Sequence, residues 1–432
     1  MSPDSVAVIG FVVLFGLMLL RVPVGMAMGL VGVTGFGYLV GAEPALKMVG
    51  QTSMRIVTDY TFGVIPMFLL MGAIVSRSGM SRELFHAANT FVGHRRGGLG
   101  IATIAACAGF AAISGSSVAT AATFSTVAYP EMRRFDYPQS FATGVIAAGG
   151  TLGAMFPPSI VLAVYGLITQ QDIGKLFIAG VLPGLLAVSM YMATIAIISQ
   201  VRPRFLPATP RSSWRERLQA AREIWAPLAL FMFVIGGLYG GLFTPTEAGG
   251  MGAGGAFLIS VARRRLSGPD IRESLLQATR TAAAVFTVLI GAILFGYFLT
   301  VTQVPQKVTE FITGMGMGRY GVLAVIMLMY LALGCLMDSM AMIILTVPII
   351  FPVITSLGFD PVWFGIIIVM TVELGLIHPP VGMNVFVIKT VVKDVSFATI
   401  FLGVIPFVLT DIARLVVLIV FPAIALWLPG RM

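Results

Sequence analysis

The sequence predicts an all-α polytopic membrane protein made of two inverted repeats. Of its 432 residues, 58% are hydrophobic and only 10% are charged, whereas a soluble globular protein usually carries about 25% charged residues. Apolar runs of the length that crosses a bilayer, about 20 residues, recur along the whole chain. Helix breakers and polar residues of the first half return 222 positions later. The clearest pairs are Pro23 with Pro245, Pro130 with Pro352, and Asp172 with Asp394.

The first repeat opens with apolar spans. The segment 79–97 is amphipathic with basic flanks, which is typical of a helix at the membrane interface. Two apolar arms follow, each short for a full crossing, and 114–117 joins them, which favours a re-entrant hairpin. Pro157 and Pro158 interrupt the next helix. In chain order we expect spans at 6–20, 24–41 and 62–78, the interfacial helix, arms at 98–113 and 117–130, a span at 140–155 that resumes to 169, and a span at 174–199.

A polar linker at 200–222, with six arginines, separates the two repeats. The second repeat follows the same order, with two arms around Asp338 and a break at Pro379 and Pro380. We expect spans at 224–241 and 246–262, an amphipathic stretch near 268–279, a span at 281–302, arms at 320–336 and 339–355, the broken run, and a last span at 395–427.

The basic residues orient the repeats. Cytoplasmic loops of membrane proteins carry an excess of Lys and Arg, so we place the basic segment 79–97 in the cytoplasm. Counting the crossings then puts the arginines of 200–222 and of 263–265 on the same side, together with Lys389 and Lys393. The second hairpin must open from the opposite face, so the halves are expected to be inverted.

Four places are expected to interrupt helices inside the bilayer: 114–117, 149–158, 337–339 and 373–380. Interrupted backbone at membrane depth has to line a polar cavity or be buried in protein. Free N–H groups at such breaks suit an anion, and free carbonyls suit Na⁺. Matched breaks in two repeats are the best sequence indication of a transporter's binding site.

The candidate ligands at these breaks are hard oxygen donors, which suit an alkali cation better than a transition metal. For sodium they are Ser116, Gly149, Thr151, Gly153, Asp338, Glu373 and Gly375. For the solute they are Ser116, Ser117, Pro157, Pro158, Ser339, Pro379, Pro380 and Asn384.

Purely structural roles remain possible for each of these residues taken alone. The prolines would then only kink helices and the glycines only permit close packing. A lone histidine such as His378 is more often a hydrogen-bonded structural residue. Asn384 either binds the solute or stabilises the helix break at 373–380. Asp411 and Arg414, three residues apart, are interpreted as an intrahelical pair in which each neutralises the other.

Other classes of protein find little support. Gly316–Gly321 matches G-x-G-x-x-G, but no strand precedes it, and no P-loop, H-E-x-x-H or nucleophile elbow occurs. An enzyme is therefore not expected. The basic residues lie in short loops and form no single patch, so no nucleic-acid partner is expected. Cys107 and Cys335 lie in apolar runs and are interpreted as buried thiols.

Six segments that span nearly the whole chain carry a further signal: Gly63–Gly72, Ile113–Thr120, Gly150–Ser159, Gly180–Gly184, Phe243–Ala248 and Glu373–Asn384. In this order they resemble a known family, the large membrane subunit of tripartite ATP-independent periplasmic (TRAP) transporters. Departures are slight, such as Gly249-Gly250, and concern packing.

The resemblance implies a secondary transporter of the bacterial inner membrane that works as an elevator. It implies coupling to a Na⁺ gradient, without a cofactor, and a carboxylate-bearing solute delivered by a soluble periplasmic binding protein. A small four-helix membrane subunit is expected as a separate chain within the lipid bilayer. Residues 1–60 and 223–280 would form the scaffold and arms, 61–199 and 281–432 the hairpins and transport helices, and 200–222 the cytoplasmic linker.

Two alternatives remain at this point. One is a stand-alone ion-coupled carrier of dicarboxylates or inorganic anions with a similar fold. The other is an intramembrane enzyme or lipid-handling protein that uses Asp338 and Glu373 as paired carboxylates. The duplication argues against the second, because inverted half-sites serve alternating access and give an enzyme no advantage.

Overall fold

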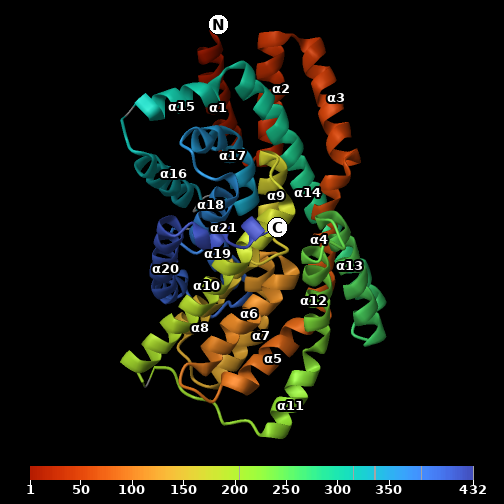
Figure 1. The fold of residues 1–432 in the computed structure, drawn as a ribbon, viewed down its shortest axis with the longest axis vertical. Helices are drawn as coiled ribbons and strands as arrows, with labels where there is room; N and C mark the ends of the chain where they lie inside the picture. The colour runs from red at the N-terminus through yellow and green to blue at the C-terminus, as the bar shows by residue number, and fades with distance from the viewer. Residues whose placement is uncertain (204, 315, 335–336, 381, 432) are drawn as a thin grey trace.

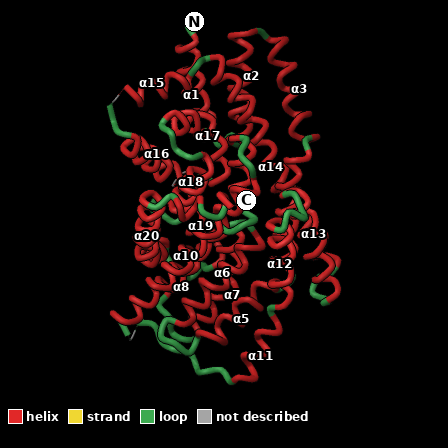
Figure 2. Tube along the Cα trace, in the orientation of Figure 1, coloured by secondary structure: helices red, strands yellow, loops and turns green. Residues whose placement is uncertain are grey.

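The computed structural model describes the chain except residues 204, 315, 335–336, 381 and 432. The described residues form helices joined by short loops and contain no strand (Figure 2). The predicted all-helical fold is therefore confirmed. Cys335 lies outside the described residues, whereas Cys107 is buried as expected.

The first half contains α1 (Pro3–Leu19), α2 (Val24–Val40), α3 (Ala42–Thr58), η1 (Tyr60–Gly63), α4 (Val64–Arg77), α5 (Met80–Val92), α6 (Gly98–Ser114), α7 (Ser117–Arg134), α8 (Gln139–Thr151), η2 (Leu152–Ala154), α9 (Ile160–Thr169) and α10 (Ile173–Val201). The second half contains α11 (Trp214–Glu223), α12 (Trp225–Tyr239), α13 (Pro245–Ala262), α14 (Gly268–Val301), α15 (Val304–Gly314), α16 (Arg319–Gly334), α17 (Ser339–Ser356), α18 (Pro361–Gly375), α19 (Met383–Val391), α20 (Phe397–Val420), α21 (Ala423–Leu426) and η3 (Pro429–Arg431).

One expected boundary is absent. The sequence predicts an amphipathic stretch near 268–279 and a separate span at 281–302, but α14 is a single helix of 34 residues. No glycine or proline lies between Pro269 and Gly291, so nothing in the sequence ends the helix when its pattern changes from amphipathic to apolar.

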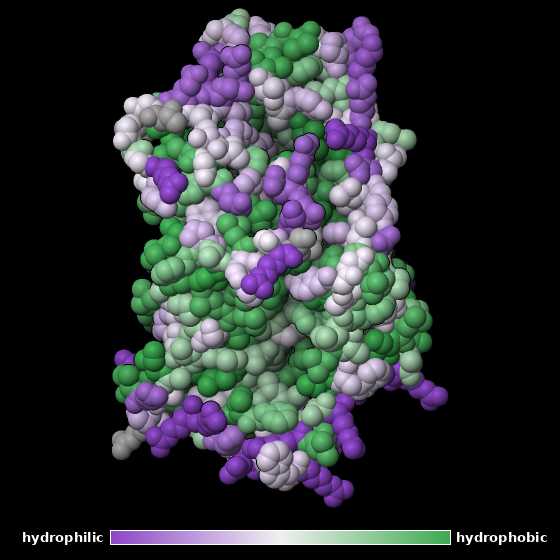
Figure 3. Space-filling model, in the orientation of Figure 1, coloured by the Kyte–Doolittle hydropathy of each residue, from purple (hydrophilic) through white to green (hydrophobic). Residues whose placement is uncertain are grey.

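Within the described part of the chain, five helices are long and apolar enough to cross a membrane, or six if the bent pair α11–α12 counts as one span. Helix α6 of the first hairpin, with 17 residues, and the halves of the broken helices are shorter, whereas α7 has 18 residues but carries Glu131, Arg133 and Arg134. Figure 3 shows a broad band of apolar side chains below the centre of the molecule, with hydrophilic ones at its lower end, near α11, and others over its upper half. That distribution suits a protein embedded in a bilayer.

Helices α1, α2, α4, α12, α13 and α14 form one packed group, called here the scaffold, in which α2 packs on α14, and α4 packs on α13 and α14. It includes α4 and the end of α14, which we expected among the transport helices of 61–199 and 281–432, because these helices pack mainly on α13 and α2. Small residues let the backbones approach closely. A Cβ at Gly25 would lie 2.6 Å from Cα of Val288, and one at Gly32 would lie 2.6 Å from the carbonyl carbon of Leu294. We infer that α2 and α14 form a rigid unit.

The remaining core, called here the transport domain, contains α6 to α10 and α16 to α20. Its tightest contact is between α8 and α20, where a Cβ at Gly144 would overlap the carbonyl oxygen of Gly403. In Figure 1 the α6–α7 pair lies in the lower half of the molecule and the α16–α17 pair in the upper half. The two pairs thus approach the centre from opposite ends.

Candidate functional site

The first hairpin turns at Gly115 between α6 and α7. Gly115 has φ of +62°, a left-handed conformation that favours glycine. Ser116 then caps α7, because its side-chain oxygen accepts a hydrogen bond from the backbone N–H of Ala119 at 3.3 Å. The tip is therefore fixed by two local features that the sequence Ser-Gly-Ser-Ser carries.

This tip packs directly on the break between α8 and α9. A Cβ at Gly115 would overlap the carbonyl oxygen of Pro158, and one at Gly153 would overlap the carbonyl carbon of Ser116. Helix α9 restarts at Ser159, whose Oγ donates to the Ala154 carbonyl oxygen at 2.5 Å and accepts from the N–H of Leu162 at 3.1 Å. Backbone groups of the hairpin and of the broken helix thus face each other with little between them.

The second hairpin and its break repeat this arrangement. Asp338 caps α17, its carboxylate accepting from the N–H of Ala341 at 3.2 Å. Gly334, at the end of α16, touches Gly375, at the end of α18, and a Cβ on either glycine would lie 2.8 Å from the other's Cα. The peptide bonds Pro157–Pro158 and Pro379–Pro380 are both cis.

The two repeats meet at Glu373. Ser117 Oγ donates a hydrogen bond to Glu373 Oε2 at 2.5 Å, which joins the first hairpin to the second broken helix. Asn384, near the start of α19, approaches the same place, because a Cβ at Gly150 would lie 3.1 Å from its Nδ2 and 3.3 Å from the Ser117 carbonyl oxygen. Ser117 therefore contacts Glu373 through its hydroxyl, its carbonyl lies beside Gly150, and Gly150 lies beside Asn384.

Two side chains of this cluster, Glu373 and Asn384, carry buried polar atoms that form no hydrogen bond among the described residues. Glu373 is 1% exposed and Asn384 is fully buried. Among the described residues, Glu373 Oε1 and both polar atoms of the Asn384 amide have no hydrogen-bond partner. Buried polar groups are rarely left unsatisfied. A carboxylate oxygen, an amide oxygen and nearby backbone carbonyls are the ligands that a hard cation binds.

Other predicted residues face different neighbours. A Cβ at Gly149 would lie 2.6 Å from Sγ of Cys107 on α6. The Thr151 hydroxyl contacts the Ala148 carbonyl oxygen at 2.7 Å and the Tyr191 hydroxyl at 3.1 Å. Asp338 is exposed, whereas Ser339 is buried.

The proline pairs differ between the repeats. Pro157 and Pro158 are buried, whereas Pro379 and Pro380 are exposed. The first pair is covered because the Gly115 turn packs on Pro158.

One buried network was missed from the sequence. The intrahelical pair of Asp411 and Arg414 is present at 2.8 Å and nearly inaccessible to solvent. Tyr191 of α10 joins it, with its hydroxyl 2.7 Å from each Asp411 carboxylate oxygen, and Tyr191 in turn reaches Thr151. The pair therefore also ties the end of α8 to α10 and α20. A tyrosine within an apolar run gives no sequence signal for this role.

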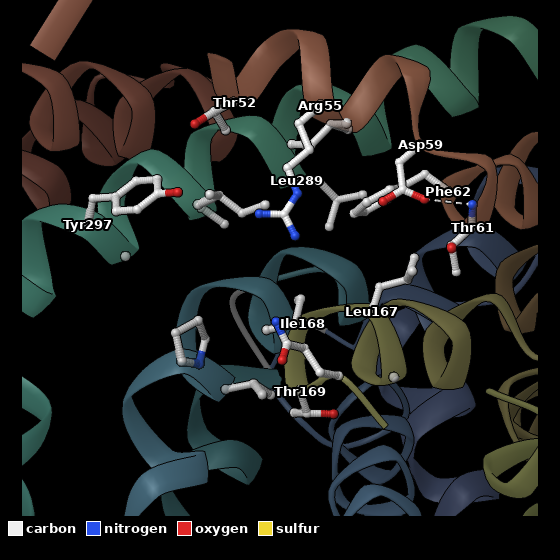
Figure 4. Close-up of a pocket in the computed structure, with 18 of the residues that line it drawn as sticks. Thr52, Arg55, Asp59, Thr61, Phe62, Leu167, Ile168, Thr169, Leu289 and Tyr297 are labelled. Carbon is white, nitrogen blue, oxygen red and sulfur yellow. Dashed lines mark hydrogen bonds between the residues drawn. The ribbon is translucent and has the colours of Figure 1, made fainter. Parts of the chain in front are cut away.

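A large cavity, called here the interdomain cavity, separates the scaffold side from the transport domain. Its volume is about 1550 Å³, and its walls come from α3 and α14 on one side and from α9 and α17 on the other. In Figure 4 the guanidinium group of Arg55 projects from α3 into this space, toward Ile168 and Thr169 of α9. No sequence pattern distinguishes Arg55 from the other arginines of the chain.

Paired hairpins and helices broken at a shared polar centre define a polytopic secondary transporter. The comparisons then identify the family. Residues 11–424 match the family described as "Tripartite ATP-independent periplasmic transporter, DctM component". The chain belongs to this DctM family and is a large permease subunit of a TRAP transporter, a multi-pass protein of the inner membrane.

Known proteins are similar to this chain over most of its length. It is 41% identical over 372 residues to the C4-dicarboxylate TRAP transporter large permease protein DctM of Pseudomonas aeruginosa, covering 86% of each chain. It is 31% identical over 415 residues to the sialic acid TRAP transporter large permease protein SiaM of Vibrio cholerae, covering 96% of each. The fold resembles the crystal structure of the Alcanivorax borkumensis YdaH transporter with a TM-score of 0.61 at 13% identity, covering 90% of this chain and 88% of that one.

Proposed function

We propose that this permease subunit imports a carboxylate-bearing small solute together with Na⁺. The observation that carries the proposal is the meeting point of Ser117, Glu373 and Asn384, where buried oxygens lie beside two interrupted helices. Such oxygens neutralise and coordinate a cation. A buried carboxylate oxygen without a partner is costly unless a cation or a proton compensates it.

The carboxylate nature of the solute rests on two supports. The relatives named for C4-dicarboxylates and for sialic acid act on solutes that carry a carboxylate. Helix α7 begins at the first hairpin tip, at the neutral cap Ser116, and the amides at a helix start attract negative charge. Helix α17 begins at Asp338, whose own carboxylate already caps it. A solute anion and a cation would thus find complementary groups at the same centre.

The movement proposed is an elevator, in which the transport domain shifts as a rigid body against the scaffold. The glycine contacts within each group support rigidity, and the interdomain cavity supports a separable boundary. The named relatives are TRAP transporter subunits, so we propose a soluble periplasmic binding protein as the solute donor. A small four-helix membrane subunit is proposed to assist in the bilayer.

The proposal is tested in proteoliposomes that contain the permease and its small subunit. Uptake of labelled succinate and N-acetylneuraminate is measured with and without an inward Na⁺ gradient, and with and without candidate binding proteins. We expect uptake to require both the gradient and one binding protein. Uptake that does not depend on a binding protein would instead indicate the stand-alone carrier. Uptake that does not depend on the Na⁺ gradient would refute the proposed coupling.

A further inference from the structure

The interdomain cavity contains one cationic side chain that is not matched by an acid. Four charged residues line this cavity: Lys47, Arg55, Asp59 and Asp172. Lys47 is paired with Glu43 at 2.6 Å. Among the described residues Arg55 takes part in no ion pair.

The two acids of the cavity are engaged with backbone amides. Asp59 accepts a hydrogen bond from the N–H of Thr61 at 2.9 Å, and Asp172 accepts from the N–H of Lys175 at 3.0 Å. Each carboxylate thus caps the start of a helix, which already compensates part of its charge. Arg55 is therefore the residue in this cavity with spare capacity for an anion.

The surroundings of Arg55 suit a small anion. Figure 4 shows the guanidinium group in open space between α3 and α9, with the Tyr297 hydroxyl of α14 pointing toward the same space. A guanidinium offers five N–H donors and binds a carboxylate through two parallel hydrogen bonds. Thr52 and Tyr297 also line the cavity and bring hydroxyl groups to it, whereas the Thr169 hydroxyl donates to the Tyr165 carbonyl oxygen.

The hairpin tips and the proline breaks supply no such cation. No Lys or Arg occurs in 114–117, 151–159, 337–339 or 373–384. The cavity nevertheless reaches toward the second tip through Val347 of α17. Val347 follows Ser339 by eight residues, which is roughly 12 Å along the helix. The α17 wall of the cavity therefore begins about two helical turns from the second tip.

We propose that Arg55 binds the anionic group of the solute in the interdomain cavity, on its way to the hairpin tips. This inference rests on the proposed function insofar as the solute is an anion. It places the positively charged partner of that anion on α3, outside the transport domain. A site on the scaffold side would hold the solute when it enters and release it to the moving domain.

The test measures occupancy of the cavity directly. Ile168→Cys places a thiol on the wall facing Arg55, and its labelling by N-ethylmaleimide is followed in the purified full-length permease with increasing succinate or N-acetylneuraminate. The chain without this substitution, which keeps only Cys107 and Cys335, gives the background. Arg55 is exposed, so Arg55→Gln should fold, and size-exclusion chromatography checks this.

We expect at least one of the two anions to slow the labelling. In Arg55→Gln the half-protecting concentration should rise roughly tenfold, the loss of a charge-assisted hydrogen-bonded pair. Arg55→Lys should keep most of the protection. All of these substitutions are made in the Ile168→Cys background. In Lys47→Gln, the matched control in the same cavity, the anion should protect the thiol as well as it does with Lys47 present, because Lys47 is already paired.

The outcomes separate this inference from the proposed function. If neither anion protects, or if Arg55→Gln protects at the wild-type concentration, Arg55 does not bind the anion. Protection that depends on Arg55, without Na⁺-driven uptake by the wild type, would sustain the inference and refute the proposed coupling. Na⁺-driven uptake with an unchanged KM in Arg55→Gln would sustain the proposed function and refute the inference.

Discussion

Glu373 is the buried carboxylate of the central site, and its charge is only partly compensated by the described residues. Its side chain is buried, one carboxylate oxygen accepts from Ser117, and the other has no partner among the described residues. A lone carboxylate is costly to bury, and a bound cation removes that cost. The residue is therefore the most direct reporter of cation coupling.

We expect Glu373→Gln to abolish the dependence of uptake on Na⁺. The amide keeps the shape and still accepts from Ser117, but it removes the negative charge that would hold the cation. Na⁺-stimulated uptake should fall at least tenfold, a loss of about 1.4 kcal/mol or more. Ser117→Ala, which keeps the charge, should only raise the half-saturating Na⁺ concentration. A wild-type Na⁺ curve in Glu373→Gln would remove Glu373 from the ion site.

The buried Tyr191–Asp411–Arg414 network is expected to act on stability. Asp411→Ala leaves Arg414 buried and unpaired, and breaking a buried pair from one side typically costs about 3–5 kcal/mol. Tyr191→Phe keeps the pair and should cost about 1 kcal/mol. Thermal unfolding of the detergent-purified protein measures both, and the double variant Asp411→Leu/Arg414→Met should recover much of the loss. A Tm for Asp411→Ala equal to the wild-type Tm would contradict this role.

At the scale of helices, much of the architecture could be predicted because its signals are local. Gly115 in its left-handed turn and the cap Ser116 end one arm and start the next, so 114–117 could be read as a hairpin tip. The proline pairs likewise interrupt their helices where expected. Continuity of α14 was not predicted, because a change of pattern was interpreted as an end although no breaker is present.

Gly115 and Gly358 allow the hairpin turn to be tested against a matched glycine. Both have positive φ, +62° and +74°, and an alanine there costs about 1–2 kcal/mol in backbone conformation. A Cβ at Gly115 would also overlap the Pro158 carbonyl oxygen, whereas nothing lies within 4 Å of one at Gly358. We expect Gly115→Ala to lose at least tenfold in uptake and Gly358→Ala to transport normally. Equal effects would show that the contact with Pro158 is unimportant.

At the scale of the whole molecule, the sequence alone could not locate the contacts between repeats. Ser117 and Glu373 are 256 residues apart and meet only through the packing of the two halves. Tyr191 and Asp411 are 220 residues apart, and Arg55 lines a cavity together with α9, more than 100 residues further along the chain. Repeats and breakers indicate where helices stop, but tertiary packing decides which polar groups become neighbours and which are left unpaired.

The elevator movement makes a prediction for the boundary between the two groups of helices. Ser76 of α4, in the scaffold, lies beside Thr123 of α7, in the first hairpin, with their hydroxyl oxygens 3.4 Å apart. Thr194 of α10 and Thr410 of α20 are both in the transport domain, with hydroxyl oxygens 2.6 Å apart. A disulfide between cysteines at the first pair would span the boundary, whereas one at the second pair would lie within the transport domain.

We expect the oxidised Ser76→Cys/Thr123→Cys variant to lose at least tenfold in uptake, because the disulfide fixes hairpin and scaffold in one arrangement. Reduction should restore uptake, and each single cysteine variant should transport normally under oxidising conditions. The Thr194→Cys/Thr410→Cys disulfide joins helices that move together and should leave uptake intact. Full uptake by the completely cross-linked Ser76–Thr123 pair would mean that α4 and the hairpin do not move relative to each other, and the elevator mechanism would be wrong.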